Sequence, residues 1–245
     1  MRTSNPALNS ETFTFTGFAD KSERMTIGGA VNKTLILTIL VFISAYWTWT
    51  NFSAMLPNTY IWLLGGAIGG FIIAMVTISR KTWSPFTTPI YAVLEGITLG
   101  GISFIFESDY PGIVIQAIVL TFGTLFSLLI AYKSGLIKPT ENFKLGVVAA
   151  TGGIAIIYLV DLALRFFGKS VPIINESSTG GIIFSIFVVI LAALNLVLDF
   201  DFIETGAAMG APKYMEWYAA FGLLVTLIWL YLEILRLLVK MRRRN

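Results

Sequence analysis

Five acidic residues lie inside long apolar stretches of this 245-residue chain, namely Glu95, Asp161, Asp199, Asp201 and Glu233. A charged side chain at bilayer depth costs about 2.5 to 3.5 kcal/mol on insertion scales, so each of these groups needs a partner, water or a functional role. The chain contains no histidine. Any response to pH must therefore come from buried carboxyl groups.

Asp199 and Asp201 are two residues apart, so on a helix they project about 200° from each other and cannot face one cavity together. Asp199 lies deeper in its apolar run and is expected to face inward, whereas Asp201 and Glu95 are candidates for an ion pathway. Glu233 precedes Arg236 by three residues, so it either forms a local ion pair or faces Asp199. If the two carboxyl groups meet, they would share a proton and titrate as a coupled pair.

Asp161 and Arg165 have the i,i+4 spacing that supports an ion pair on one helix face. This structural role is favoured for both residues. Glu95 precedes Gly96 and Gly100, whose spacing lets another helix approach closely. Glu95 is therefore either packed and hydrogen-bonded or an oxygen donor for a passing cation, since calcium favours carboxylate and carbonyl ligands.

The composition excludes a water-soluble protein. Hydrophobic residues make up 56% of the chain and charged residues 13%, and the mean hydropathy is +0.80. The absence of cysteine and histidine removes thiol chemistry and the usual zinc ligands, so no cofactor is expected. The basic cluster at residues 242–244 suits anionic lipid headgroups rather than a nucleic acid, and no nucleic-acid partner is expected.

Seven apolar runs are each close to the roughly 20 residues that a spanning helix needs. Without period-two alternation, runs of this length favour helices over barrel strands. The predicted spans are residues 34–52, 60–79, 88–106, 112–132, 145–167, 181–203 and 216–239. The sequence therefore predicts an all-α, polytopic membrane protein, with a polar tail at residues 1–27 and a single transmembrane domain at residues 28–245.

The distribution of Lys and Arg predicts a cytoplasmic amino terminus, because the tail and alternate loops hold most of the basic residues. Seven crossings would place the basic carboxyl end outside, which conflicts with this rule. Either the early helices decide the topology or one late segment is re-entrant, and seven crossings are favoured.

Two late segments carry a resemblance to a known family. They read L-N-L-V-L-D-F-D-F-I-E-T-G-A at 194–207 and P-K-Y-M-E-W-Y-A-A-F-G-L-L-V-T-L-I-W-L-Y-L-E-I-L-R-L-L at 212–238. The opening M-R-T-S-N-P-A-L-N and the segment E-G-I-T-L-G at 95–100 also fit. The chain resembles the bacterial branch of the Bax inhibitor-1-like family, also called the transmembrane Bax inhibitor motif family.

The resemblance implies a seven-helix bundle with the last helix near the centre, acting as a pH-sensitive calcium leak in a bacterial plasma membrane. The proton-sensing pair of the family falls on Asp199 and on Glu233, where better-known relatives have a second aspartate. The same two residues would be the transient calcium ligands. The family's arginine partner on the second helix has no close match, and Arg80 is a candidate. The implied partners are the lipid bilayer, calcium or another small cation, and protons; the oligomeric state stays open.

Other classes of membrane protein also use buried carboxylates. A proton-coupled secondary transporter is one alternative, although clear inverted repeats are missing, and a non-conducting membrane regulator is another. An enzyme is not expected, because the G-x-G-D motif of intramembrane aspartyl proteases is missing. A retinal protein is disfavoured because Lys240 lies only at the edge of the last span.

Overall fold

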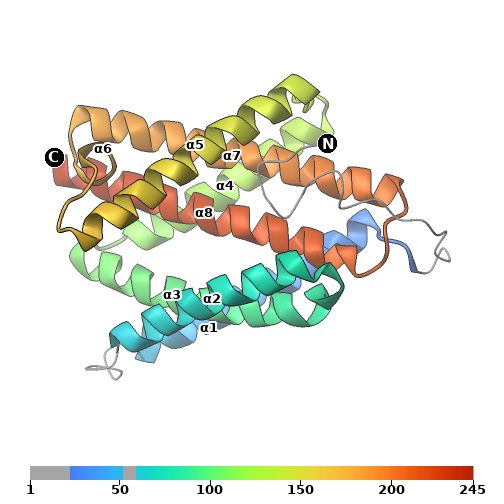
Figure 1. Cartoon of the computed structure of the whole chain (residues 1–245), viewed down its shortest axis with the longest axis horizontal. Coiled ribbons are helices and arrows are strands. Elements are labelled where there is room, and N and C mark those ends of the chain that lie inside the picture. Colours follow the sequence, from blue (N-terminus) through green and yellow to red (C-terminus); the bar gives the residue numbers. More distant parts are fainter. Residues whose placement is uncertain (1–22, 52–58, 245) are drawn as a thin grey trace. The chain divides into compact units, whose positions relative to one another are not determined.

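The computed structural model describes residues 23–51 and 59–244, which form eight α-helices and one 3₁₀ turn (Figure 1). The elements are α1 (Ile27–Asn51), α2 (Thr59–Ser79), η3 (Lys81–Trp83), α3 (Ser84–Asp109), α4 (Ile113–Lys133), α5 (Glu141–Phe166), α6 (Pro172–Asn175), α7 (Thr179–Ala208) and α8 (Met215–Arg244). Within this described part, all helices except the four-residue α6 are long and apolar enough to cross a membrane. The predicted all-α polytopic fold with seven spans is confirmed.

Each predicted span corresponds to one long helix, but several helices extend beyond the apolar run. Helix α3 begins at Ser84 rather than 88, because Pro85 sits in the first turn, where its missing N–H costs no helix bond. The polar stretch 168–180, between the fifth and sixth predicted spans, contains the short helix α6. Residues 1–22 of the tail and residues 52–58, at the junction of the first two predicted spans, lie outside the described residues.

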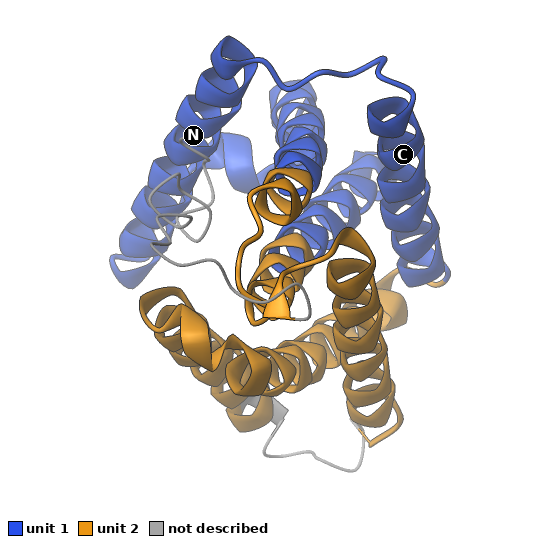
Figure 2. Cartoon of the chain, turned by 90° about the vertical axis from the view of Figure 1, so that its right-hand side faces the viewer, with its two compact units in different colours: residues 1–11, 112–201, 225–245 blue, residues 12–111, 202–224 orange. Residues whose placement is uncertain are grey.

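The chain divides into two compact units (Figure 2). In the described chain, the first unit consists of residues 112–201 and 225–244, and the second of residues 23–51, 59–111 and 202–224. Helices α7 and α8 contribute residues to both.

In the second unit, α3 packs against α1 and α2 through glycines. Gly100 of α3 lies against the backbone of Ala45 in α1, and Gly66 of α2 lies against the backbone carbonyl of Leu94 in α3. A Cβ atom at either glycine would overlap these backbone atoms. The glycine patterns therefore bring helices of the same chain together, as small residues do in membrane bundles.

The second unit also joins the segment before α1 to the turn between α7 and α8. The Met25 amide donates to the Ala211 carbonyl at 2.6 Å, and the Lys213 amide donates to the Glu23 carbonyl at 2.7 Å. These bonds pair two short stretches that are far apart in sequence.

In the first unit, α5 and α7 share an apolar core. Val147 and Ile154 of α5 pack with Val188 and Leu191 of α7, and Trp229 of α8 lies against this cluster. The polar residues described below are set into this apolar framework.

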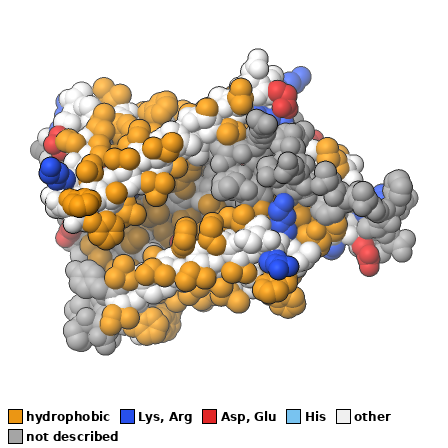
Figure 3. Space-filling view, viewed as in Figure 1, with side chains coloured by type: hydrophobic (Ala, Val, Ile, Leu, Met, Phe, Trp, Pro, Cys, Tyr) orange, Lys and Arg blue, Asp and Glu red, His pale blue; other side chains and the backbone are white. Residues whose placement is uncertain are grey.

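The last helix is the most buried span. In its most apolar window 67% of α8 is buried, against 17% for α2 and for α5. The outward faces of those helices instead expose large side chains such as Phe71 and Leu159, which a bilayer would cover. On the face seen in Figure 3, hydrophobic side chains dominate the described surface and few charged ones are seen. The central position of the last helix stays a prediction.

Candidate functional site

Asp199 is buried on α7 without a cationic partner in the described chain. Its residue is 2% exposed, and its carboxyl group is hydrogen-bonded to the side chain of Thr226 on α8. The Oδ2 atom has no hydrogen-bond partner among the described residues. The flanking residues Leu198 and Phe200 are also buried. The arrangement is a carboxyl group with one neutral donor and one bare oxygen inside a membrane bundle.

A second polar contact lies one turn before Asp199. The Asn195 side-chain amide donates to the Thr151 hydroxyl on α5 at 2.9 Å and to the Leu191 carbonyl on its own helix at 2.9 Å. Polar side chains of α7 therefore reach both α5 and α8 near Asp199.

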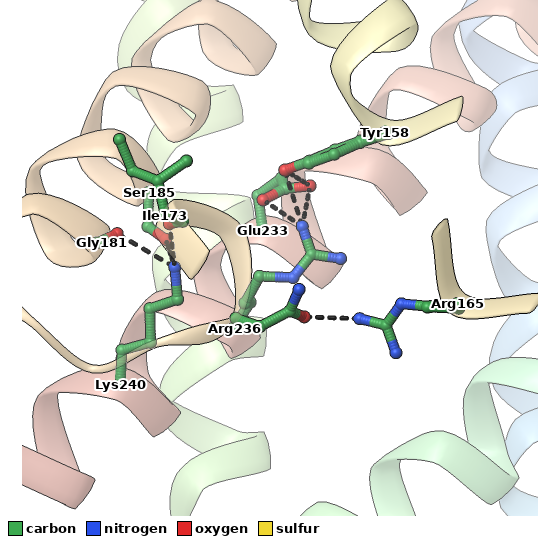
Figure 4. A network of polar contacts seen from close by, with 9 residues as sticks. Tyr158, Arg165, Ile173, Gly181, Ser185, Glu233, Arg236 and Lys240 are labelled. Atoms are coloured by element: carbon green, nitrogen blue, oxygen red, sulfur yellow. Dashed lines mark hydrogen bonds and ion pairs between the residues drawn. The ribbon is translucent and has the colours of Figure 1, made fainter. Parts of the chain in front are cut away.

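Glu233 lies on α8 in a different set of contacts (Figure 4). Its carboxylate accepts from the Arg236 guanidinium at 2.9 and 3.0 Å and from the Tyr158 hydroxyl of α5 at 2.9 Å. The same guanidinium nitrogen donates to the Tyr158 oxygen at 2.6 Å, and the Arg236 cation lies 5.0 Å from the Tyr158 ring centroid. Glu233 is 1% exposed. A buried carboxylate is thus compensated by an arginine three residues away on the same helix.

Asp199 and Glu233 have different hydrogen-bond partners in the described chain. No hydrogen bond joins the two carboxyl groups in the described chain, since each has other partners and Asp199 Oδ2 has none. Thr226, the partner of Asp199 on α8, precedes Glu233 by seven residues, which is about 10 Å of helix rise. Arg236 offers Glu233 an attractive charge, whereas a second carboxylate would repel it. The proton-sensing and calcium-binding roles of the two residues stay predictions.

Asp161 and Arg165 form the ion pair that their spacing indicates, at 2.9 Å between Oδ2 and Nε. The Asp161 carboxylate also accepts from the Val171 amide at 2.7 Å and the Asn175 side-chain amide at 2.9 Å. The Arg165 guanidinium donates to the Asn175 side-chain oxygen in turn. These contacts join the end of α5 to α6, so the arrangement of the pair is that of a structural ion pair.

Asp201, a candidate for an ion pathway, is paired with a cation. Its Oδ2 lies 2.7 Å from the Lys144 ammonium, which is also 3.4 Å from Glu141. Lys144 is 4% exposed. The sequence places this lysine next to a loop, but Thr140 caps α5 by accepting from the Phe143 amide, so Lys144 lies within the first turns of the helix.

Glu95, the other pathway candidate, belongs to the second unit. It is half-buried on α3, and its carboxylate lies so close to Gly70 of α2 that a Cβ there would collide with it. No ion pair to Glu95 is found in the described chain. Its role in ion passage stays a prediction.

Sequence reasoning missed three buried charged residues and two hydroxyl partners. Lys240 and Glu216 are buried at opposite ends of α8, and Lys144 is buried on α5. Tyr158 and Thr226 bond the two candidate acids. Lysines near the end of an apolar run usually lie at the membrane interface, so the sequence does not indicate that Lys144 and Lys240 are buried. The ion pair of Glu216 could have been predicted, because Lys213 lies three residues before it.

The described residues contain no group of three or more acidic side chains that could hold a metal ion. A protein-family model described as Bax inhibitor 1 like matches residues 5–243. A search of the curated proteins and a search of the solved structures found no match. The matched range includes the seven long helices up to the penultimate residue of α8 and both segments in which the sequence motifs lie.

Proposed function

The chain belongs to the Bax inhibitor 1 like family, as its motifs predicted, and on this premise we propose that it is a passive leak for calcium or another small cation. The proposed gate is the charge state of Asp199. The observation that carries the proposal is the Asp199 carboxyl group, buried between α7 and α8 with one oxygen left without a partner in the described chain.

The ionised and protonated forms of Asp199 need different partners. When ionised, the carboxylate has the Thr226 side chain as its one described partner, so a cation or water at Oδ2 would stabilise it. When protonated, it carries no charge and offers an O–H donor to the same neighbours. Proton binding would therefore remove an oxygen ligand for a passing cation and alter the contact between α7 and α8.

Glu233 is expected to act differently. Arg236 and Tyr158 already compensate its carboxylate, so its charge is stabilised without a permeating ion. This arrangement supports Asp199 as the pH-dependent group, in place of a coupled pair of Asp199 and Glu233.

The test is calcium flux into liposomes that contain the purified protein and a calcium-sensitive dye, measured across a range of pH. We expect pH-dependent flux for the wild type, flux independent of pH for Asp199→Asn, and retained pH dependence for Glu233→Gln. Glu176→Gln is the matched control, because Glu176 is exposed.

Each outcome separates the alternatives. Loss of pH dependence in both Asp199→Asn and Glu233→Gln would favour the coupled pair. Calcium uptake against its gradient, driven by a proton gradient, would favour a secondary transporter. Purified, folded protein that passes no cation at any pH would leave a non-conducting regulator and remove the leak.

A further inference from the structure

Lys240 is a buried cation near the carboxyl end of α8. Its residue is 3% exposed, and its ammonium group donates to the Ser185 hydroxyl at 2.8 Å and to the Gly181 carbonyl at 3.0 Å. The Ile173 carbonyl lies at 3.4 Å, a longer and weaker contact (Figure 4). A lysine ammonium has three N–H donors, so three oxygens from α6 and α7 match its donors in number.

All three oxygens are neutral. The ion pairs of the described chain do not include Lys240. The carboxylate of Glu233, about two turns earlier on α8, is ion-paired with Arg236. A buried charge is normally paired with an opposite charge, whereas here the direct contacts are carbonyl and hydroxyl dipoles, and the charges of Glu233 and Arg236 act on the ammonium group without an ion pair to it. Such neutral oxygens are the ligands that proteins use for dehydrated monovalent cations, while calcium sites are built with carboxylates.

The oxygen ligands are held in place by bonds that do not involve the lysine. Ser178 accepts from the Gly181 amide at 3.2 Å and its carbonyl accepts from the Ile182 amide at 3.0 Å. The Glu176 amide donates to the Pro172 carbonyl at 2.8 Å, which closes α6. Gly181 also lies against the backbone carbonyl of Glu176 so closely that a Cβ would overlap it.

Ser185 is one helical turn beyond Gly181 and is 1% exposed, so both of these ligands face the same buried point. Because local backbone bonds set the positions of the ligands, the site should persist when the ammonium group is removed.

We propose that these oxygens of Ile173, Gly181 and Ser185 form a monovalent-cation site that the chain fills with its own Lys240 ammonium group. The ions of suitable chemistry are ammonium, methylammonium, potassium and rubidium. In the wild type, the tethered ammonium joins the end of α8 to α6 and α7 and keeps free cations out of the site. The inference goes beyond the proposed leak and does not depend on it.

The test compares two variants of the purified full chain in detergent, with choline as the only other cation. Lys240→Ala removes the ammonium group and leaves space beside the oxygens, whereas Lys240→Met removes the charge but keeps most of the side-chain volume. We expect both variants to unfold at a lower temperature than the wild type. Methylammonium or rubidium should raise the unfolding temperature of Lys240→Ala in a saturable manner, because a ligand that binds only the folded state stabilises it.

Equilibrium dialysis with radioactive rubidium provides a direct measurement. We expect one saturable site in Lys240→Ala and none in Lys240→Met or the wild type. Adding Ser185→Ala to Lys240→Ala removes one ligand oxygen and should weaken rubidium binding about tenfold, the equivalent of one lost polar contact.

Three results would overturn the proposal. The first is Lys240→Ala that binds no rubidium and gains no stability from either cation. The second is an equal gain in Lys240→Met or the wild type, which would indicate a general salt effect. The third is a failure to purify folded Lys240→Ala in methylammonium under conditions in which Lys240→Met is purified folded. The proposal requires methylammonium to replace the missing ammonium group.

Discussion

Glu216 connects the first turn of α8 to the segment that begins α1, and replacing it should destabilise the second unit. Its fully buried carboxylate accepts from the Thr26 amide at 3.0 Å and the Thr26 hydroxyl at 2.9 Å. The ammonium groups of Lys33 and Lys213 each lie 2.9 Å from it. Gly29 allows this approach, because a Cβ there would overlap the carboxylate.

The contacts allow the loss in Glu216→Ala to be worked out. The two bonds to Thr26 resemble a helix cap, which contributes about 1 kcal/mol. The two lysine side chains are 23% and 50% exposed, so each ion pair contributes only about 0.5 kcal/mol. Glu216→Ala should therefore lower the free energy of unfolding by about 2 kcal/mol. Glu216→Gln keeps an acceptor for Thr26 and loses the ion pairs, so we expect about half that loss.

The assay is reversible unfolding of the purified protein in mixed micelles with increasing denaturing detergent. Glu176→Ala is the control, because this exposed side chain should leave the unfolding midpoint unchanged. Wild-type stability in Glu216→Ala would refute the reasoning. A loss in Glu216→Gln as large as in Glu216→Ala would show that the ion pairs, rather than the bonds to Thr26, hold the segment.

Two further predictions concern helix packing and a buried ion pair, and the same unfolding assay checks both. Gly100→Ala places a Cβ against the backbone of α1 and should lower the free energy of unfolding by about 1 to 3 kcal/mol. The control Gly65→Ala meets open space and should leave the free energy of unfolding unchanged or raise it by up to about 1 kcal/mol. Equal effects of the two substitutions would exclude close packing at Gly100. Lys144→Met leaves Asp201 without its 2.7 Å partner and should cost about 2 kcal/mol, part of which Asp201→Asn should recover in the double variant. Additive losses in that double variant would show that the two side chains do not interact.

The spans could be predicted from sequence because a bilayer demands long apolar helices, a requirement that each helix meets alone. The close contacts of Gly66 and Gly100 were predictable for a similar reason, since small residues four apart leave a groove on one helix face. The exact ends of the helices could be predicted less well. Helix α7 continues to Ala208 and α8 to Arg244, because a helix can extend beyond the apolar core into polar residues without losing its backbone bonds.

The side-chain partners were predictable where they were local. Asp161 with Arg165 and Glu233 with Arg236 are pairs within one turn of a helix, and both form. The partner of Asp201 is distant in sequence, because Lys144 approaches it from another helix. Which residues of two helices face each other depends on their rotation and packing, and one sequence does not specify this.

This distinction between local and distant partners identifies the acids that are left for function. Asp161, Glu216 and Glu233 each have a basic residue three or four positions away on the chain, and each is ion-paired with it. Asp199 and Glu95 have no basic residue at that spacing, and no ion pair reaches either of them in the described chain. Their charges are therefore the ones that a permeating cation or a proton can compensate. Of these two acids, only Asp199 is fully buried and has one oxygen without a partner in the described chain, so it is the first to test. If Asp199→Asn leaves the pH dependence of calcium flux intact, Glu95 is the carboxyl group to which the same reasoning leads next.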